Sequence, residues 1–324
     1  MVDRRTLIAA AVGLVAGRPR AQPRRLRLAF FSEGTLATHR PYLDALRAGL
    51  RELGRVEGAD LAIETHWGAD TLKSLGWMAV EIVDGAPDVI VTTCAFTTRA
   101  ALKATRTLPV VFVIGSDPVA LGYAASLARP GGNATGIGMQ HVEVSAKRLQ
   151  LLKEAAPRVT RVGVLYASED PSSTGPLHDT LAAAPRLGLQ LTPAIAWSRR
   201  ELLEAFDRLR DERVEALFDL NGLSINFEQR RLFAELALRA RWPSMCFAGE
   251  FVDDGGLMSY GPNDVDMFRH AATFVDKIAR GARPAELPVE QPTRFELACN
   301  LTTARALGLT LPQAILARAD RVVG

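Results

Sequence analysis

Short polar side chains and carboxylates stand at several points where an apolar run of the sequence ends. Thr93 and Thr97 flank the predicted start of a helix, and hydroxyl groups beside free backbone N–H groups suit a carboxylate. Asp219 and Glu250 follow two later apolar runs, and their carboxylates suit an ammonium group or another cation. These residue types predict the binding of a small charged or polar molecule, with aromatic side chains covering its apolar part.

The candidate ligand-binding residues stand at or just beyond the ends of predicted strands, where ligands gather in open parallel sheets. They are Phe31, Ser32, Thr93, Phe96, Thr97, Ser116, Asp117, Tyr166, Ser168, Glu169, Asp219, Asn221 and Glu250. Each has a purely structural alternative: Thr97 could cap its helix, Asp117 could start a turn, the other acids could be solvated, and the aromatic residues could belong to the core. Polar groups at equivalent ends in both halves of the chain favour binding.

Signatures of catalysis and of metal binding are missing. The sequence has no G-x-G-x-x-G after a strand, no Walker loop and no G-x-S-x-G motif. Its three cysteines, Cys94, Cys246 and Cys299, are odd in number and widely spaced, and its five histidines form no HExxH motif. We therefore expect a binding protein rather than an enzyme, with no cofactor, no metal and no disulfide framework.

The elements that must position these residues alternate between short apolar runs and amphipathic helical stretches. Strands are predicted in a first series at Leu26–Phe31, Leu61–Trp67, Asp88–Thr93, Pro109–Ile114 and Ala134–Ile137. A second series is predicted at Arg161–Tyr166, Leu189–Ile195, Glu215–Asp219, Ser244–Ala248 and Leu257–Tyr260. Alternating strands and helices imply parallel sheets with right-handed crossovers. The prediction is an α/β protein with two doubly wound parallel-sheet lobes joined by a hinge.

The remaining chain is predicted to return to both lobes. A helix is expected over Asp264–Arg280, a strand over Phe295–Asn300 and two short helices after it. The 324 residues are 48% hydrophobic, enough for a core in each lobe. Lys and Arg number 39 against 36 Asp and Glu, and the two signs are interspersed. Since nucleic-acid binding needs clustered basic residues, we expect no nucleic-acid partner.

The N-terminus has the pattern of an export signal. Arg4 and Arg5 precede an apolar run over Leu7–Ala16, which is too short to span a bilayer and typical of a secretory leader. The Arg pair indicates the twin-arginine route, and no Cys near the expected cut after Ala21 could carry a lipid. We expect residues 1–22 to be a leader and the mature protein to be periplasmic. The alternative is a frayed apolar tail.

Several motifs match a known family in combination. They are Pro109–Phe112 with Asp117–Val119, Ser126–Gly136, Leu151–Lys153 with Arg161–Tyr166, Leu287–Leu297, Asn300, Ala306–Leu309 and Arg318–Asp320. Together they resemble the ABC-importer solute-binding proteins, a family that includes tryptophan- and tyrosine-binding members. Two features depart from that family: the lipid-anchoring Cys is missing, and Cys94-Ala95-Phe96 stands where relatives often have smaller residues. The second departure leaves the identity of the solute open.

The resemblance implies a type I periplasmic-binding fold with three hinge strands, near Gly136, Gly261 and Pro292. The expected lobes are residues 24–137 with 262–290, and 138–261 with 291–324. The implied function is the capture of a small solute, such as an amino acid or another small carboxylate, by a monomer that delivers it to an ABC permease and its ATPase. A ligand-sensing module for a receptor or a two-component system remains the alternative. An enzyme on a similar fold or a regulator's ligand domain is disfavoured by the missing motifs.

Overall fold

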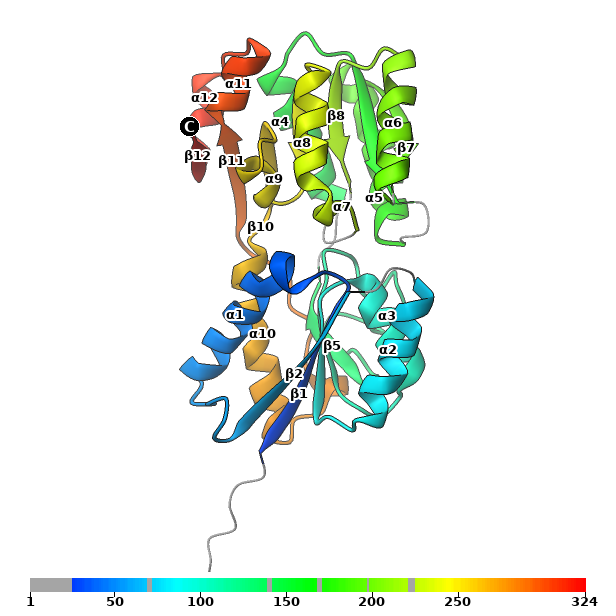
Figure 1. Cartoon of the computed structure of the whole chain (residues 1–324), viewed down its shortest axis with the longest axis vertical. Coiled ribbons are helices and arrows are strands. Elements are labelled where there is room, and N and C mark those ends of the chain that lie inside the picture. The colour runs from blue at the N-terminus through cyan, green and yellow to red at the C-terminus, as the bar shows by residue number, and fades with distance from the viewer. Residues whose placement is uncertain (1–24, 69–71, 139–141, 168–170, 197, 221–224) are drawn as a thin grey trace, which may run out of the picture.

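Each half of the chain forms its own sheet in the computed structural model, which describes residues 25–68, 72–138, 142–167, 171–196, 198–220 and 225–324. The two α/β lobes are stacked along the long axis of the molecule (Figure 1). The predicted leader, residues 1–22, lies outside the described residues. Among the described residues, no helix combines the length and the apolar character that crossing a bilayer requires.

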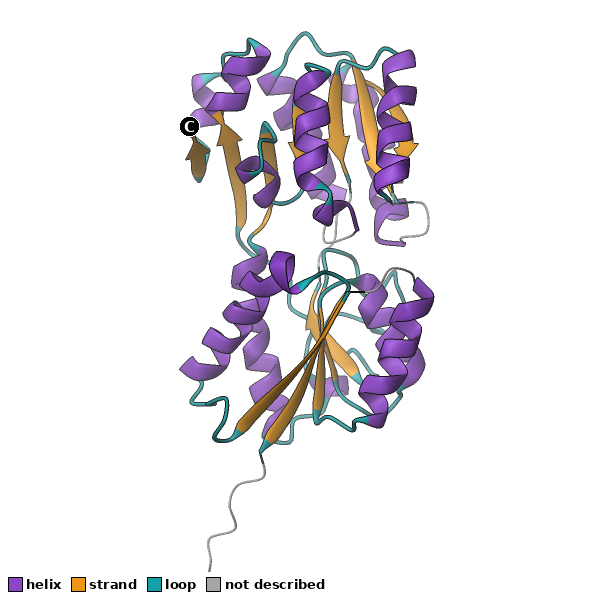
Figure 2. Ribbon diagram, viewed as in Figure 1, coloured by secondary structure: helices purple, strands orange, loops and turns teal. Residues whose placement is uncertain are grey.

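The sheet of the first lobe is wholly parallel, with the order β2-β1-β3-β4-β5. Its strands are β1 (Leu26–Ser32), β2 (Leu61–Trp67), β3 (Val89–Thr92), β4 (Val110–Val113) and β5 (Ala134–Ile137). Its helices are α1 (Leu36–Glu52), α2 (Leu72–Asp84), α3 (Ala95–Ala104) and α10 (Asp264–Ala279), with a short 3-10 turn, η2 (Pro284–Glu286). Helices α1 and α10 cover one face of this sheet, and α2 and α3 cover the other (Figure 2).

Side-chain alternation along β1 builds the two cores of this lobe. Leu28 and Phe30 point into the core formed with α1 and α10, whereas Ala29 and Phe31 point into the core formed with α2 and α3. Successive residues of a strand face opposite sides of the sheet, and all four side chains are buried. The continuous apolar run of β1 is therefore explained by a sheet that is covered on both faces.

The second lobe has a larger sheet with the order β12-β11-β10-β9-β8-β6-β7. Its strands are β6 (Arg161–Tyr166), β7 (Gln190–Ile195), β8 (Ala216–Asp219), β9 (Ser244–Cys246), β10 (Met258–Pro262), β11 (Phe295–Asn300) and β12 (Arg321–Val323). Its helices are α4 (Val142–Ala155), α5 (Pro171–Ala183), η1 (Ala184–Leu187), α6 (Arg199–Asp211), α7 (Ile225–Glu228), α8 (Arg230–Arg239), α9 (Glu250–Asp253), α11 (Leu301–Leu307) and α12 (Gln313–Leu316).

Two features of this sheet differ from the prediction. Strand β11 runs antiparallel to β10, because the chain returns from the first lobe and enters the sheet in the opposite direction. The sheet is therefore mostly, not wholly, parallel. The short strand β12 was not predicted, and it pairs with β11 through Ala298, Cys299 and Asn300. The predicted α/β class with two doubly wound lobes is confirmed.

The described chain passes between the lobes in three places that lie close together. Ile137, after β5, forms a bridge with Glu290, and the Glu290 amide donates to the Gly136 carbonyl at 3.0 Å. Residues of all three crossovers, among them Ile137, Asn263 and Glu290, line one pocket of about 350 Å³. Close crossovers of this kind suit a hinge. The predicted lobe boundaries, as the limits of two moving units, stay a prediction.

Gly136 allows the close strand pairing at this hinge. Its φ of +145° belongs to a region that L-residues avoid, and a Cβ there would lie 2.0 Å from the carbonyl oxygen of Phe112. We expect Gly136→Ala to lower the free energy of unfolding by roughly 2–5 kcal/mol through backbone strain and overpacking, measured by urea and thermal unfolding.

Gly76 supplies the matched control, because it lies inside α2 with open space where a Cβ would stand. Gly76→Ala should leave stability unchanged or raise it by up to ~1 kcal/mol. Equal stability of the wild-type chain and Gly136→Ala would contradict the requirement for glycine at the hinge.

Candidate ligand-binding site

The carboxyl ends of the parallel strands in both lobes face the junction between the lobes (Figure 1). The lobes touch there: a Cβ on Gly115, after β4, would lie 3.1 Å from Cζ of Phe247, which follows β9 in the other lobe. The structure therefore has its lobes closed on each other. Those residues predicted from strand ends that the structure describes belong to this junction or to the core just beneath it.

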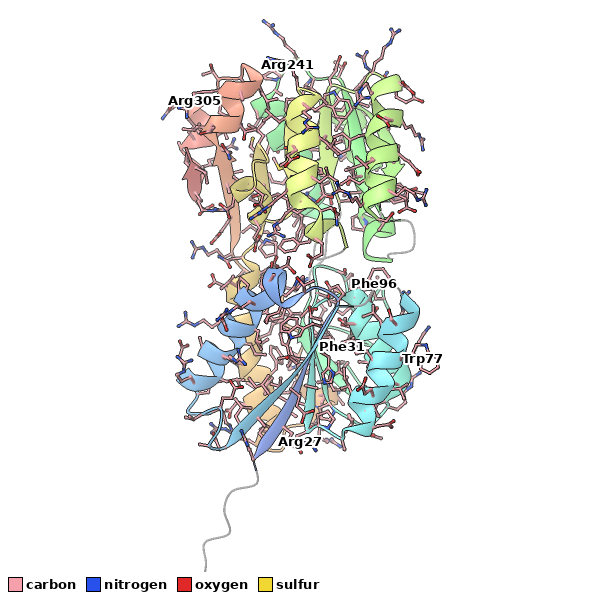
Figure 3. All side chains as sticks on the ribbon, viewed as in Figure 1. Arg27, Phe31, Trp77, Phe96, Arg241 and Arg305 are labelled. Carbon is pink, nitrogen blue, oxygen red and sulfur yellow. The ribbon has the colours of Figure 1, made fainter. Side chains whose placement is uncertain are left out.

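Phe31 and Ser32 lie next to each other on β1 but face opposite sides of the sheet. Phe31 is fully buried in the core with α2 and α3 (Figure 3). This is the position that the alternative for the aromatic candidates, membership of the core, describes. Ser32 is also buried, and its hydroxyl accepts a hydrogen bond from the Gly34 amide at 3.1 Å. It shapes the turn that leads to α1.

The two threonines after β3 use their hydroxyl groups within the first lobe. Thr93 donates to Oε2 of Glu33 at 2.5 Å. Thr97 donates to the Cys94 carbonyl at 3.1 Å and accepts from the Cys94 amide at 3.2 Å. Cys94 is the N-cap of α3, so Thr97 completes a capping box. Both threonines are buried at the junction side of the lobe, and their predicted roles toward a solute are untested.

The remaining candidates of the first lobe follow β3 and β4. Phe96 is 4% exposed, with the guanidinium of Arg99 5.0 Å from its ring centre. Asp117 accepts bonds from the amides of Val119 and Ala120 at 2.8 and 3.2 Å, so it organises the turn after β4. Ser116 is 3% exposed, and no hydrogen bond joins its hydroxyl to another described residue.

The candidates of the second lobe are partly outside the described residues. Ser168, Glu169 and Asn221 belong to the parts that are not described. Tyr166 is half-buried at the end of β6, against the core of this lobe. Asp219 is 1% exposed at the end of β8.

A buried arginine lies beside Asp219 and was not anticipated from the sequence. Arg148 of α4 is 2% exposed, and its guanidinium carbon lies 4.6 Å and 5.6 Å from the ring centres of Phe218 and Phe247. Its Nη2 donates to the main-chain carbonyl of Asp219. Burial lowers the pKa of Arg148 to about 10, and the Asp219 charge opposes that shift. An arginine inside an apolar helix face has no sequence signal that separates it from a surface arginine.

A second set of polar residues that was not predicted from the sequence joins the two lobes at the start of α1. His39 is 1% exposed; its Nε2 lies 3.7 Å from Oε1 of Glu33, and its Nδ1 lies 3.8 Å from Oε1 of Glu228 in the other lobe. Glu228 also accepts bonds from the Thr35 amide at 3.3 Å and from the Thr38 hydroxyl. Glu228 thus supplies a carboxylate to the N-terminus of α1, where the helix dipole favours negative charge.

Glu33 is the buried anion of this group. Burial by itself would raise the pKa of Glu33. The neighbouring His39 and the Thr93 hydroxyl lower this pKa by more than burial raises it, so the net shift is downward. The carboxylate is therefore held ionised inside the first lobe. No predicted strand or helix required a charge at this position, and only the position of Glu33 just after β1 could have suggested it.

Aromatic rings continue the contact between the lobes. We call Tyr42, Phe227, Phe251 and Phe268 the aromatic seam. Tyr42 of α1 stacks on Phe268 of α10 at 4.9 Å between ring centres and reaches Phe227 of α7 at 6.3 Å. Phe227 reaches Phe251 of α9 at 6.2 Å. All four are at most 1% exposed, so opening of the lobes would expose apolar surface.

Two carboxyl groups lie next to the aromatic seam. The Tyr42 hydroxyl donates to Oε1 of Glu250 at 3.1 Å. Asp264, the first residue of α10, is 6% exposed. Burial and the nearby charge of Glu250 raise the pKa of Asp264 well above its ordinary value, and burial with both carboxylates raises that of the Tyr42 hydroxyl. Of the three, only Glu250 was among the residues predicted from the sequence.

Two α/β lobes that meet at the carboxyl ends of their strands, with buried polar groups on both sides, define a two-lobed binding protein. The chain belongs to the ABC transporter substrate binding protein family, whose model matches residues 39–323. The family that the sequence motifs resemble is thereby confirmed. It is a family of solute-binding proteins and not of enzymes.

Relatives support the same assignment. A tyrosine-binding protein from Clostridioides difficile is 22% identical over 277 residues, which cover 83% of this chain and 78% of that protein. A conserved domain protein from Vibrio cholerae has a TM-score of 0.85 at 25% identity over 92% of this chain and 100% of its own. A Streptococcus pneumoniae ABC domain in complex with L-Trp has a TM-score of 0.85 at 21% identity, with the same coverage.

The contact of Glu228 with the start of α1 should stabilise the closed arrangement. We expect Glu228→Ala to shift the ratio of closed to open molecules toward open by roughly 5- to 30-fold, because a lost charge-assisted hydrogen bond costs about 1–2 kcal/mol. Small-angle scattering of the solute-free chain should show a larger radius of gyration. Glu235→Ala is the matched control, since Glu235 is exposed on α8 and has Arg239 as its one ion-pair partner among the described residues. An unchanged profile for Glu228→Ala would contradict the closing role.

The buried Asp264 should make stability depend on pH. The unfolded chain releases this proton near the ordinary pKa of 3.8, whereas the folded chain holds it to higher pH. Folding then becomes less favourable as pH rises from that value through the raised folded pKa. We expect Asp264→Asn to raise the melting temperature of the solute-free chain by roughly 2–4 °C at neutral pH, with the gain shrinking toward pH ~4. A variant that melts lower at neutral pH would contradict the assignment.

Proposed function

We propose that the chain is the extracytoplasmic solute-binding protein of an ABC-type importer. It captures a small solute between its two lobes and delivers it to a membrane permease with its ATPase. The observation that carries this proposal is the meeting of both sets of strand ends at a junction with buried polar groups from each lobe, in a chain of the substrate-binding family. The N-terminal pattern supports export to the periplasm.

The solute that the junction suits best is an amino acid or another small carboxylate with an apolar part. The curated relative from Clostridioides difficile is a tyrosine-binding protein, and the Streptococcus pneumoniae structure contains L-Trp. The junction here offers both signs of charge, with Arg148 and Asp219 in one lobe and Glu33 in the other. Aromatic rings at both sides could cover an apolar group.

Ser116 is the residue of the first lobe best placed to bind the solute directly. Its hydroxyl is buried after β4 and makes no hydrogen bond to another described residue. Gly115 beside it faces Phe247 across the junction. Thr93, Thr97, Tyr166, Asp219 and Glu250 remain proposed contacts, as do Ser168, Glu169 and Asn221.

Solute binding should compact the protein and raise its melting temperature. The experiment is a thermal-shift screen of amino acids, aromatic and branched carboxylates, sugars and purines, followed by small-angle scattering with each hit. A solute at 100 times its Kd should contribute ~2.7 kcal/mol of stability, and the radius of gyration should be smaller than that of the empty chain. Ser116→Ala should weaken binding of the hit by roughly 5- to 15-fold, since a neutral hydrogen bond contributes about 1–1.5 kcal/mol.

The control is the same titration with heat-denatured protein and with Gly76→Ala, which changes only the exposed side of α2. If no solute of the screen or of a cell extract stabilises the chain, the solute-binding proposal is wrong. If the only hit is a neutral sugar or nucleoside, the capture function stands and the carboxylate class is wrong.

A further inference from the structure

We propose that His39 forms a proton-dependent latch between the two lobes, in which closure places its imidazole between one carboxylate of each lobe and a proton is taken up. The latch consists of His39 in the first turns of α1, Glu33 just after β1 in the same lobe, and Glu228 at the end of α7 in the other lobe. The inference rests on the proposed function, because a solute-binding protein opens and closes, and it states how acidity acts on that step.

The imidazole of His39 lies between the two carboxylates and away from water. Its Nε2 is 3.7 Å from Oε1 of Glu33, its Nδ1 is 3.8 Å from Oε1 of Glu228, and the residue is 1% exposed. The rings of Tyr42 and Phe227 enclose it, with centres 5.3 and 5.7 Å away. Charges attract more strongly where water is excluded, so a proton on this ring is stabilised by both carboxylates.

The turn between β1 and α1 holds the imidazole in this position. A Cβ on Gly34 would overlap the ring of His39, so the glycine leaves the space that the ring occupies. The same turn presents Glu33 to Nε2. The contact of His39 with Glu33 is therefore built within the first lobe, whereas its contact with Glu228 exists only while the lobes touch.

The neutral imidazole leaves two buried atoms without a hydrogen bond. The Thr38 hydroxyl donates to Glu228, so Nδ1 of His39, 2.9 Å from the Thr38 oxygen, carries the ring hydrogen and donates to that oxygen. Nε2 then presents a lone pair to Oε1 of Glu33, and neither atom has a hydrogen-bond partner among the described residues. Such buried groups are costly. A proton on Nε2 replaces this contact of two acceptors with an ion pair.

Closure and protonation favour each other. The open state keeps Glu33 beside His39, and the closed state adds Glu228, so the closed state binds the proton more tightly. The added stability of the closed state is complete where the open state is already protonated, and it is lost as pH rises through the range in which the closed state releases the proton. Histidine side chains change charge between about pH 5 and 8. Acidification within this range therefore favours closed lobes.

Few charged groups face this imidazole. Against the effect of burial, His39 lowers the pKa of Glu33, which keeps that carboxylate available for pairing. On α8, Arg230 lies 4.6 Å from the ring centre of Phe227, and it pairs with Asp254. The titratable groups packed against His39 from the turn after β1, from α1 and from α7 are, among the described residues, Glu33, Tyr42 and Glu228.

Asp264 is a second proton-binding group near the junction, and the experiment has to separate it from the latch. Burial and the charge of Glu250, which belongs to the other lobe, raise the pKa of Asp264. Protonation of Asp264 thus also favours closed lobes at acidic pH. In the Asp264→Asn variant, any remaining dependence on pH belongs to other groups.

The first measurement is an NMR titration of the His39 imidazole in the whole, solute-free chain, with its signal assigned by comparison with His39→Gln. We expect the midpoint in the wild-type chain to lie about one pH unit above that in Glu228→Gln, since an opposite charge within about 4–6 Å favours the charged form. Glu228→Gln keeps a carbonyl oxygen for the Thr38 hydroxyl and removes only the charge. Equal midpoints, or an imidazole that binds no proton between about pH 5 and 8, would overturn the latch.

The second measurement is small-angle scattering of the same chain at about pH 5.5 and about pH 8. The radius of gyration should be smaller at the lower pH, with a closed-to-open ratio roughly 10-fold higher. Glu228→Gln and His39→Gln should lose most of this change, and Asp264→Asn should retain it. His178→Gln is the matched control, because the His178 side chain is 87% exposed on α5, and it should respond like the wild-type chain.

A response that persists in Glu228→Gln and His39→Gln but disappears in Asp264→Asn would assign the proton to Asp264 and overturn the latch. So would a radius of gyration that does not change with pH in the wild-type chain. If His39→Gln does not fold, Glu228→Gln carries the comparison, since the Glu228 side chain is 25% exposed. Neither measurement contains a solute. A chain that binds a solute without this pH response therefore lacks the latch and keeps the capture function, and failure of the solute screen leaves the latch measurable.

Discussion

The contact of α1 with α7 and α9 is the interaction on which the relation between the two lobes depends. It buries the aromatic seam and brings Glu228 to the start of α1, so apolar burial and charge act in the same direction. Phe227 and Tyr42 are both at most 1% exposed, and full burial of one aromatic side chain contributes about 1.5–3 kcal/mol. A closed arrangement held by a few such contacts is stabilised by only a few kcal/mol.

Hinge motion at the three crossovers, which stays a prediction, would let this contact form and break without disturbing the core on the far side of either sheet. The three crossovers are packed together, with Gly136 at a φ of +145° and its hydrogen bond to Glu290. Each lobe has a core on the far side of its own sheet, which closure does not touch. The core that includes the seam runs through both lobes, so opening would divide that core at the seam.

The sequence predicted the strands well wherever an apolar run is bounded by turn residues. Leu61–Trp67, Ala134–Ile137, Arg161–Tyr166 and Phe295–Asn300 are strands with the predicted bounds. Strand β12 was missed because Arg321–Val323 has no alternating or apolar run long enough to be detected, and it forms only by pairing with β11. The direction of β11 could not be predicted either, since it depends on the route of the chain between the lobes rather than on the local pattern of apolar and polar residues.

The location of the candidate site at the strand ends stays a prediction. The contacts of its residues could not be predicted, because they depend on which face of the sheet each side chain occupies and on partners that are distant in sequence. One residue separates Phe31 in the core from Ser32 in the turn before α1, and no pattern in a continuous apolar run decides which face each residue occupies. His39, Tyr42 and Arg148 have partners at least 70 positions away in sequence, and Asp264 is influenced by Glu250 of a different helix. Tyr42 even lies on the apolar face of α1, where periodicity assigns it to packing alone. A carboxyl group beside another carboxyl group opposes stability, and only the fold brings Asp264 near enough to Glu250 for that charge to help raise the pKa of Asp264.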